Sequence, residues 1–170
     1  MIHLEHYTSI EKMTGILKSK KFQTAYPNNP GAADAVFNCF IVGCQYNKVQ
    51  EYEGMGVKII FEWSGETDYS AKSCVSPFLV DWKDVKSGIL YNSPGWRAFI
   101  KPPLCGCFLK VYEVKIGDSY LKKYIEETTK SCSWLPKTIK EKKLKDSKEN
   151  FKEKIHKSYK NKDLYIEITN

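Results

Sequence analysis

Apolar and polar positions alternate in three segments of the chain, and this period of two is typical of half-buried β-strands. The segments are residues 2–8, 57–63 and 164–168. A fourth segment, residues 108–116, carries β-prone residues with apolar side chains on both faces, which favours a central strand covered on both sides. The pattern therefore predicts strands at both ends of the chain and in its middle.

Three other segments repeat their apolar residues with the spacing of a helix. A helix should begin at the start of residues 10–19, because Thr8 and Glu11 stand three apart as in a capping box. A short helix is expected over residues 120–125. Residues 137–163 combine a narrow apolar stripe with many lysines, and this predicts a longer helix with one face on the core.

The remaining segments are harder to assign. Residues 36–46 fit a helix slightly better, although their bulky side chains would also suit a buried strand. Residues 26–31 are a loop by their turn residues, and residues 64–103 indicate short elements and loops. Interleaved helices and strands without regular βαβ spacing predict an α+β fold, with residues 1–170 as a single domain.

The composition is that of a globular protein. The chain has 170 residues, of which 42% are hydrophobic and 28% charged. It contains no apolar run near the roughly 20 residues that span a bilayer, and its N-terminus lacks the pattern of a signal peptide. We therefore expect a cytoplasmic protein without a membrane partner.

The six cysteines are expected to be free thiols rather than a disulfide framework. Their spacing completes no tetrahedral zinc site, so no metal is expected. The sequence also lacks the glycine patterns of P-loop and Rossmann nucleotide sites.

Positive charge is concentrated in one part of the chain. The net charge is +7, and residues 137–163 hold eleven lysines against five acidic residues. Such a segment is either a solvated helix face or a surface that attracts a nucleic-acid backbone. The second interpretation gives the alternative function for the whole chain, a non-catalytic nucleic-acid-binding or interaction module.

The first strand ends in His6, Tyr7 and Thr8, and an amphipathic helix follows at once. This opening resembles the ADP-ribosyltransferase superfamily, in particular its small bacterial and phage toxin-type members. The resemblance extends weakly to residues 57–63 and to the final residues 165–167. It implies a split β-sheet core with flanking helices and an enzyme that cleaves NAD.

The resemblance also implies the reaction. Cleavage of the bond between nicotinamide and ribose creates an oxocarbenium-like sugar, which a carboxylate stabilises. Glu167 is the first choice for this catalytic carboxylate, and Asp163 is a third possibility. Glu113 is the rival of Glu167, because alternation places it on the same face as Leu109 and Val111, an unusual place for a charge. His6 corresponds to the histidine that hydrogen-bonds a ribose of NAD, so His6 and Glu167 are expected to act as a pair.

The remaining contacts to NAD are assigned to aromatic and basic side chains. Tyr7 and Thr8 belong to the same motif as His6, and Tyr46, Tyr52 or Tyr69 would stack on nicotinamide. Arg97 would contact the diphosphate, because a guanidinium forks onto phosphate oxygens. The acceptor of ADP-ribose is expected to be a macromolecule, with DNA or RNA favoured over protein, and a toxin of this kind would have an inhibitor protein as partner.

Overall fold

The computed structural model describes residues 1–19, 37–43, 55–68, 88–92, 98–100, 109–129, 135–159 and 164–169. Eight strands belong to the sheet: β1 (Ile2–Thr8), β2 (Phe37–Ile41), β3 (Val57–Trp63), β4 (Thr67–Asp68), β5 (Leu90–Asn92), β6 (Ala98–Ile100), β7 (Leu109–Gly117) and β8 (Tyr165–Thr169). The helices within these described ranges are α1 (Ile10–Ser19), α3 (Asp118–Thr129) and α4 (Lys137–Tyr159). This arrangement confirms the predicted α+β class.

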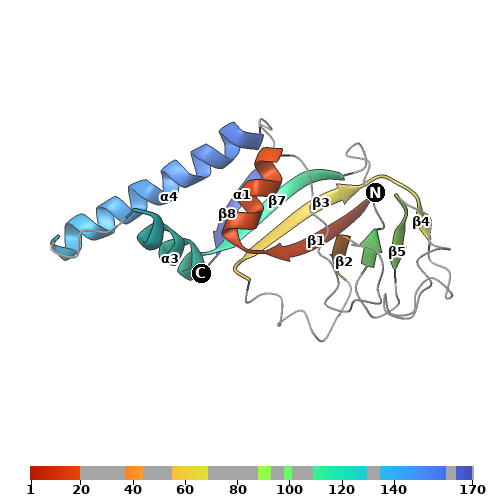
Figure 1. Cartoon of the computed structure of the whole chain (residues 1–170), viewed down its shortest axis with the longest axis horizontal. Helices are drawn as coiled ribbons and strands as arrows, with labels where there is room; N and C mark the ends of the chain where they lie inside the picture. Colours follow the sequence, from red (N-terminus) through yellow and green to blue (C-terminus); the bar gives the residue numbers. More distant parts are fainter. Residues whose placement is uncertain are drawn as a thin grey trace.

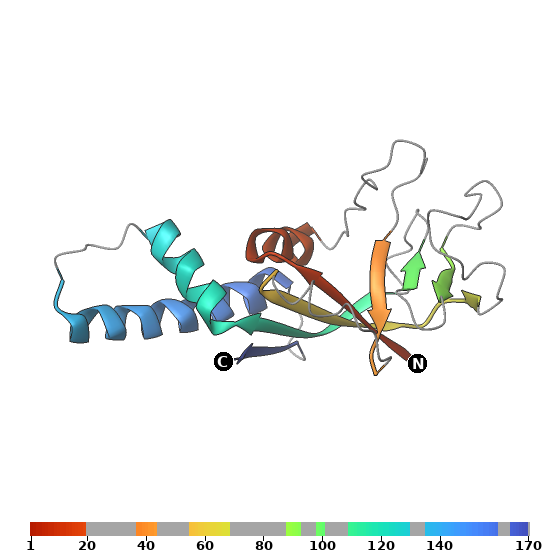
Figure 2. The same cartoon turned by 90° about the horizontal axis from the view of Figure 1, so that it is seen from below.

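The strands form one mixed sheet in the order β4-β5-β6-β2-β1-β3-β7-β8 (Figure 1). Two neighbouring pairs, β4 with β5 and β7 with β8, are parallel, and the other pairs are antiparallel. Pairing of β1 with β3 runs along the whole strand, but pairing with β2 covers only Leu4 and Glu5. Figure 2 shows β2 crossing β1 steeply. The sheet therefore has two parts that meet at a short seam between β1 and β2.

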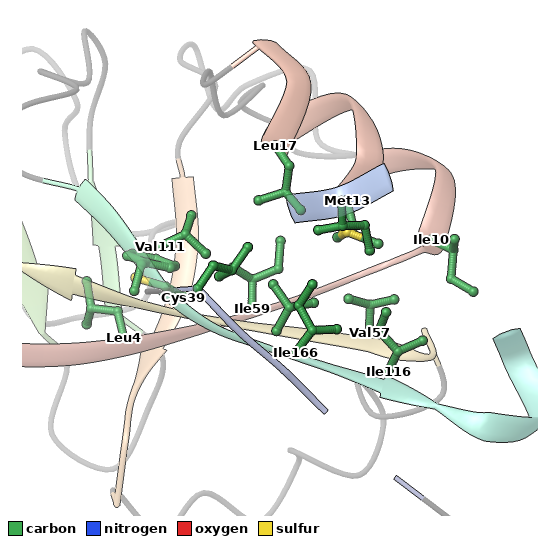
Figure 3. Close-up of a cluster of buried hydrophobic side chains, with 14 of the residues drawn as sticks. Leu4, Ile10, Met13, Leu17, Cys39, Val57, Ile59, Val111, Ile116 and Ile166 are labelled. Atoms are coloured by element: carbon green, nitrogen blue, oxygen red, sulfur yellow. The ribbon is translucent and has the colours of Figure 1, made fainter. Parts of the chain in front are cut away.

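The main core lies between the sheet and the helices. Leu4 and Ile59 from the sheet pack with Met13 and Leu17 of α1 in one buried cluster (Figure 3). Side chains from α3 and α4, among them Ile155, join the same cluster. We call this side of the sheet the helix-covered face.

Most elements lie where the sequence pattern predicted them. Strands β1, β3 and β8, the central strand β7, and helices α1 and α3 are confirmed, with boundaries within a few residues for most of them. The lysine-rich segment is helical from Lys137 to Tyr159. Short strands also occur in the described parts of residues 64–103. The predicted loop at residues 26–31 lies outside the described residues.

The helix predicted over residues 36–46 is wrong, because the described part, Phe37–Ile41, is strand β2. Cys39 and Phe40, which are consecutive residues of β2, are both buried although they point to opposite faces. A short strand covered on both sides has no alternation, so its apolar run resembles a helix in sequence. Pairing with β1 and β6 decides the outcome.

The start of α1 also differs from the prediction by one residue. Thr8 is the last residue of β1, and Ser9 caps the helix in its place. The backbone N–H of Lys12 donates to the Ser9 hydroxyl at 3.4 Å, and the Met13 N–H donates to the Ser9 carbonyl at 2.9 Å. A serine oxygen satisfies a first-turn donor as well as a threonine does, so the capping function is conserved while its position shifts.

Gly56, just before β3, and Gly117, the last residue of β7, lie next to each other beside the start of α3. Gly56 has a φ of +84°, and its carbonyl accepts a hydrogen bond of 2.9 Å from the Gly117 N–H. A Cβ added at Gly56 would lie 2.5 Å from Cγ of Tyr120. This turn therefore requires glycine both for its backbone conformation and for the close approach of the tyrosine ring.

Candidate functional site

The register of the sheet separates His6 from Glu167. Residues that pair across neighbouring strands point to the same face. His6 pairs with Ile59, Ile59 with Val114, and Val114 with Ile166, so His6 points to the helix-covered face. Glu167 is the next residue after Ile166 and points to the other side. His6 and Glu167, the pair that the resemblance implies, therefore lie on opposite faces of the sheet.

Tyr7, in contrast, shares a face with the candidate carboxylates. Tyr7 pairs with Lys58, Lys58 with Lys115, and Lys115 with Glu167. The adjoining row on the same side runs from Glu5 through Ile60 to Glu113. These two rows form the polar face, which we define by its six polar side chains: Glu5, Tyr7, Lys58, Glu113, Lys115 and Glu167.

Glu113 reaches the polar face through a β-bulge. Strict alternation along β7 would place it beside Leu109 and Val111, as the sequence suggested. The register shifts instead, because Phe61 pairs with Val111 whereas Ile60 pairs with Glu113. Tyr112 is the extra residue, so Val111 stays on the helix-covered face and Glu113 turns away from it. The expected sharing of a face with Val111 is therefore wrong.

One lysine links the two candidate catalytic carboxylates. The Lys115 ammonium lies 3.0 Å from an oxygen of Glu167 and 3.3 Å from an oxygen of Glu113. The hydrogen bond to Glu167 raises the pKa of Lys115 above its ordinary value; some desolvation opposes this shift, and the contact with Glu113 adds to it. The three groups form one ionic cluster in which both acids share a single cation.

A second ionic cluster surrounds Tyr7. The Lys58 ammonium lies 3.4 Å from a Glu5 oxygen and 5.2 Å from the centre of the Tyr7 ring. Burial raises the pKa of Tyr7, and the charge of Glu5 adds to this effect while Lys58 opposes it. Burial alone would lower the pKa of Lys58, but Tyr7 and Glu5 together raise it. The ring also meets Phe40 edge to face, with 5.9 Å between the centroids.

Sequence reasoning missed the basic half of this arrangement. Lys58 and Lys115 were visible as polar positions in alternating strands, and so was Glu5. The signal lies in the alternation itself, because polar residues at every second position of β1, β3 and β7 must share a face. Which positions lie opposite one another depends on strand pairing, which the alternation does not reveal.

The remaining site residues are placed as follows. Thr8 is buried at the end of β1 on the same side as His6, which is partly buried. Tyr46, Tyr52, Tyr69, Arg97 and Asp163 lie outside the described residues.

A groove of about 610 Å³ lies between α1, α3 and α4, and none of the predicted site residues that the structure describes lines it. Its floor includes Leu17, Phe151 and Ile155, and Lys18 and Lys154 are among its polar lining residues. Gly15 of α1 borders it, and a Cβ at this position would meet no atom within 4 Å. The groove is therefore partly a consequence of a missing side chain on α1.

Within the described ranges, no group of three or more His, Cys, Asp or Glu side chains is arranged to hold a metal ion. Cys39 is a buried free thiol, as expected for the cysteines, and the other five lie outside the described residues. None of the described helices is both long and apolar enough to cross a bilayer. Comparison of the chain with protein-family models, curated proteins and solved structures found no match.

Proposed function

We propose that the chain is a mono-ADP-ribosyltransferase that cleaves NAD and transfers ADP-ribose to a macromolecule, with nucleic acid favoured over protein. The observation that carries the proposal is the position of His6, Tyr7 and Thr8. They follow the last residue of β1 that pairs with β2, so the motif begins where the two parts of the sheet separate. A split sheet is the core that the resemblance implies.

His6 and Tyr7 are consecutive residues that point to opposite faces, so they have different roles in this proposal. His6 would bind one part of NAD on the helix-covered face. On the polar face, Tyr7 lies with Glu113 and Glu167, either of which could stabilise the positive charge on the ribose. Nicotinamide leaves with the electron pair of the broken bond, and the acceptor oxygen or nitrogen attacks the sugar carbon and then loses its proton. Tyr7, rather than His6, thus shares a face with the proposed catalytic carboxylates, two strands away from Glu113 and three strands away from Glu167.

The ion pairs of Lys115 favour a second candidate, a non-catalytic module. Both carboxylates are already bound to Lys115, so a ribose hydroxyl would have to compete with a cation at 3.0–3.3 Å. A chain that keeps this cluster intact could still bind a nucleotide or another partner without turnover. This candidate predicts binding of NAD without release of nicotinamide, or no dependence on NAD at all.

The test is incubation of the protein with NAD labelled in its adenosine part, together with DNA, RNA and protein acceptors. Release of nicotinamide and label on an acceptor are the expected results. Glu167→Gln or Glu113→Gln should lower turnover on the order of a hundredfold and preserve NAD affinity. Glu62→Gln is the matched control, because Glu62 lies on the same side of β3 as Lys58 but outside both clusters. Absence of both NAD binding and nicotinamide release would refute the proposal.

His6→Ala provides a second, independent readout. The histidine is proposed to bind NAD and not to stabilise charge on the reacting sugar. Its loss should therefore weaken NAD affinity, whereas the carboxylate variants should affect turnover alone. Equal losses of affinity in all three variants would place the histidine and the acids in one binding role and contradict this division.

A further inference from the structure

The two halves of α4 have different surroundings. The C-terminal half is attached to the rest of the protein: Ile155 is buried, and the Tyr159 hydroxyl accepts a hydrogen bond of 3.0 Å from the Val111 N–H. Phe151 meets the ring of Tyr124 edge to face, with centroids 5.7 Å apart. The N-terminal part, Lys137–Lys145, extends away from the strands in both views (Figures 1 and 2). Among its side chains only Leu144 is partly buried against the core. We call Lys137–Lys145 the α4 arm.

Unpaired positive charge is concentrated in the α4 arm. It contains five lysines and one glutamate, and all five lysines are exposed. Lys142, Lys143 and Lys145 form no ion pair with any described residue. In the rest of α4, Lys148, Lys152 and Lys157 each have an acidic partner, and Lys154 has none among the described residues. The arm therefore holds most of the helix charge that is available to a partner.

The dipole of α4 adds a positive potential to the charge of these lysines. The first turn of a helix carries the positive end of the backbone dipole, where acidic side chains stabilise and lysines destabilise. Helices α1 and α3 each have an acid in the first turn, but α4 has none there. Stability alone does not explain lysines at this end, so the arrangement indicates a function that needs a positive potential.

We infer that the α4 arm binds the phosphate backbone of double-stranded DNA. Successive helical residues are about 100° apart, so the five lysines surround the helix and do not form one flat face. The arm is about 14 Å long at a rise of about 1.5 Å per residue. A helix with cations on several sides fits the major groove, which is about 12 Å wide and has phosphates along both edges.

Other features of the arm support this partner and its mode of binding. The arm has no Arg, Asn or Gln, so lysine is its main side chain able to read base edges. A lysine ammonium is a compact point charge that suits phosphate oxygens, so binding should depend little on sequence. Its only strongly exposed large apolar residue is Ile139, at 43%, which is too little for an apolar face that enters a membrane. The inference stands independently of NAD cleavage, because it concerns a surface outside the polar face.

The test measures binding of the full chain to a fluorescent duplex of about 20 base pairs between 50 and 200 mM NaCl, without NAD. The arm variant carries Lys142→Gln, Lys143→Gln and Lys145→Gln. The control variant carries Lys152→Gln, Lys154→Gln and Lys157→Gln, which remove equal charge from the same helix. Circular dichroism establishes that both variants retain their helix content.

The wild-type affinity should fall with salt, with a slope of about −0.9 per neutralised phosphate, and the arm variant should reduce that slope by about 2.7. At 100 mM NaCl this corresponds to a loss of affinity on the order of several hundredfold, whereas the control variant should lose much less. Equal losses in both variants, binding that is insensitive to salt, or stronger binding to anionic vesicles than to duplex DNA would overturn the inference. NAD cleavage has a separate readout, so the two proposals can fail independently.

Discussion

Removal of Lys115 is the most informative perturbation of the polar face. Lys115 lies on β7 and contacts Glu113 on its own strand and Glu167 on β8. Lys115→Gln keeps a polar side chain of similar length but removes the charge. Two carboxylates on adjacent strands then lose their common cation and repel each other. We expect β8, which is held in the sheet by β7, to lose stability first.

The expected loss of stability in Lys115→Gln depends on the exposure of the charged side chains as well as on the distances between them. At 3.0–3.3 Å the two contacts are short, but the Lys115 and Glu167 side chains are 35% and 38% exposed, so water and salt screen the interaction. An exposed ion pair contributes roughly 0.2–1 kcal/mol. Two such contacts, together with the new repulsion, give an expected loss of about 1–2 kcal/mol in the free energy of unfolding.

The assay is urea unfolding at low salt and at 1 M NaCl, with Lys110→Gln as the matched control. Lys110 pairs with Glu62 at 4.0 Å and is 60% exposed, so its removal should cost only a few tenths of a kcal/mol. High salt should reduce the effect of Lys115→Gln. The triple variant with Glu113→Gln and Glu167→Gln should regain most of the loss, because no carboxylate is then left without a partner.

The same cluster predicts how stability depends on pH. The pKa of Lys115 is raised in the folded protein above its ordinary value of 10.5. A raised pKa means that the stabilisation is fully present below about pH 10.5 and is lost as the pH rises through the folded-state pKa. The difference in stability between wild type and Lys115→Gln should therefore decrease at alkaline pH. Equal destabilisation by the Lys115 and Lys110 variants, or no effect of salt, would refute the reasoning.

Three further predictions concern single buried contacts. Gly56→Ala should cost at least about 2 kcal/mol of unfolding free energy, since φ is +84° and the added Cβ meets Tyr120; an unchanged melting temperature would contradict this. Tyr159→Phe leaves the Val111 N–H without its acceptor and should cost about 1–2 kcal/mol in denaturant titration, and no change would mean that another group replaces the hydroxyl. Burial raises the pKa of the Cys39 thiol, so iodoacetamide at pH 8 should modify it only through unfolding, as peptide mapping by mass spectrometry would show; rapid labelling of the folded protein would contradict the burial.

The elements that sequence reasoning located are those with a regular period. Strands β1 and β3 carry mainly apolar side chains on one face and mainly polar, half-buried ones on the other, so the residue type at every second position indicates its side of the sheet. Strand β2 has no such contrast, because both Cys39 and Phe40 are buried. Its assignment depends on pairing with strands that lie far away in sequence, which a local pattern cannot contain.

The arrangement of the candidate site depends on strand pairing even more than the assignment of β2 does. His6 and Glu167 each lie on a correctly predicted strand, yet they point to opposite faces. Their relation depends on the register through β3 and β7, and one residue of shift in any pairing would reverse it. Similarly, the sequence shows which lysines are present, but only the strand pairing of the folded sheet places Lys115 in contact with both Glu113 and Glu167.

Because Tyr112 is the extra residue of a bulge, evolution or design could shorten β7 by one residue at this position. Without this residue, Val111, Glu113 and Val114 would alternate regularly and keep the faces that they have now. A one-residue deletion in a sheet interior normally reverses every side chain beyond it. Here the deletion would remove only the ring that stacks on His3 at 5.2 Å, so β7 contains a position at which its chain can shorten without exchanging core for surface.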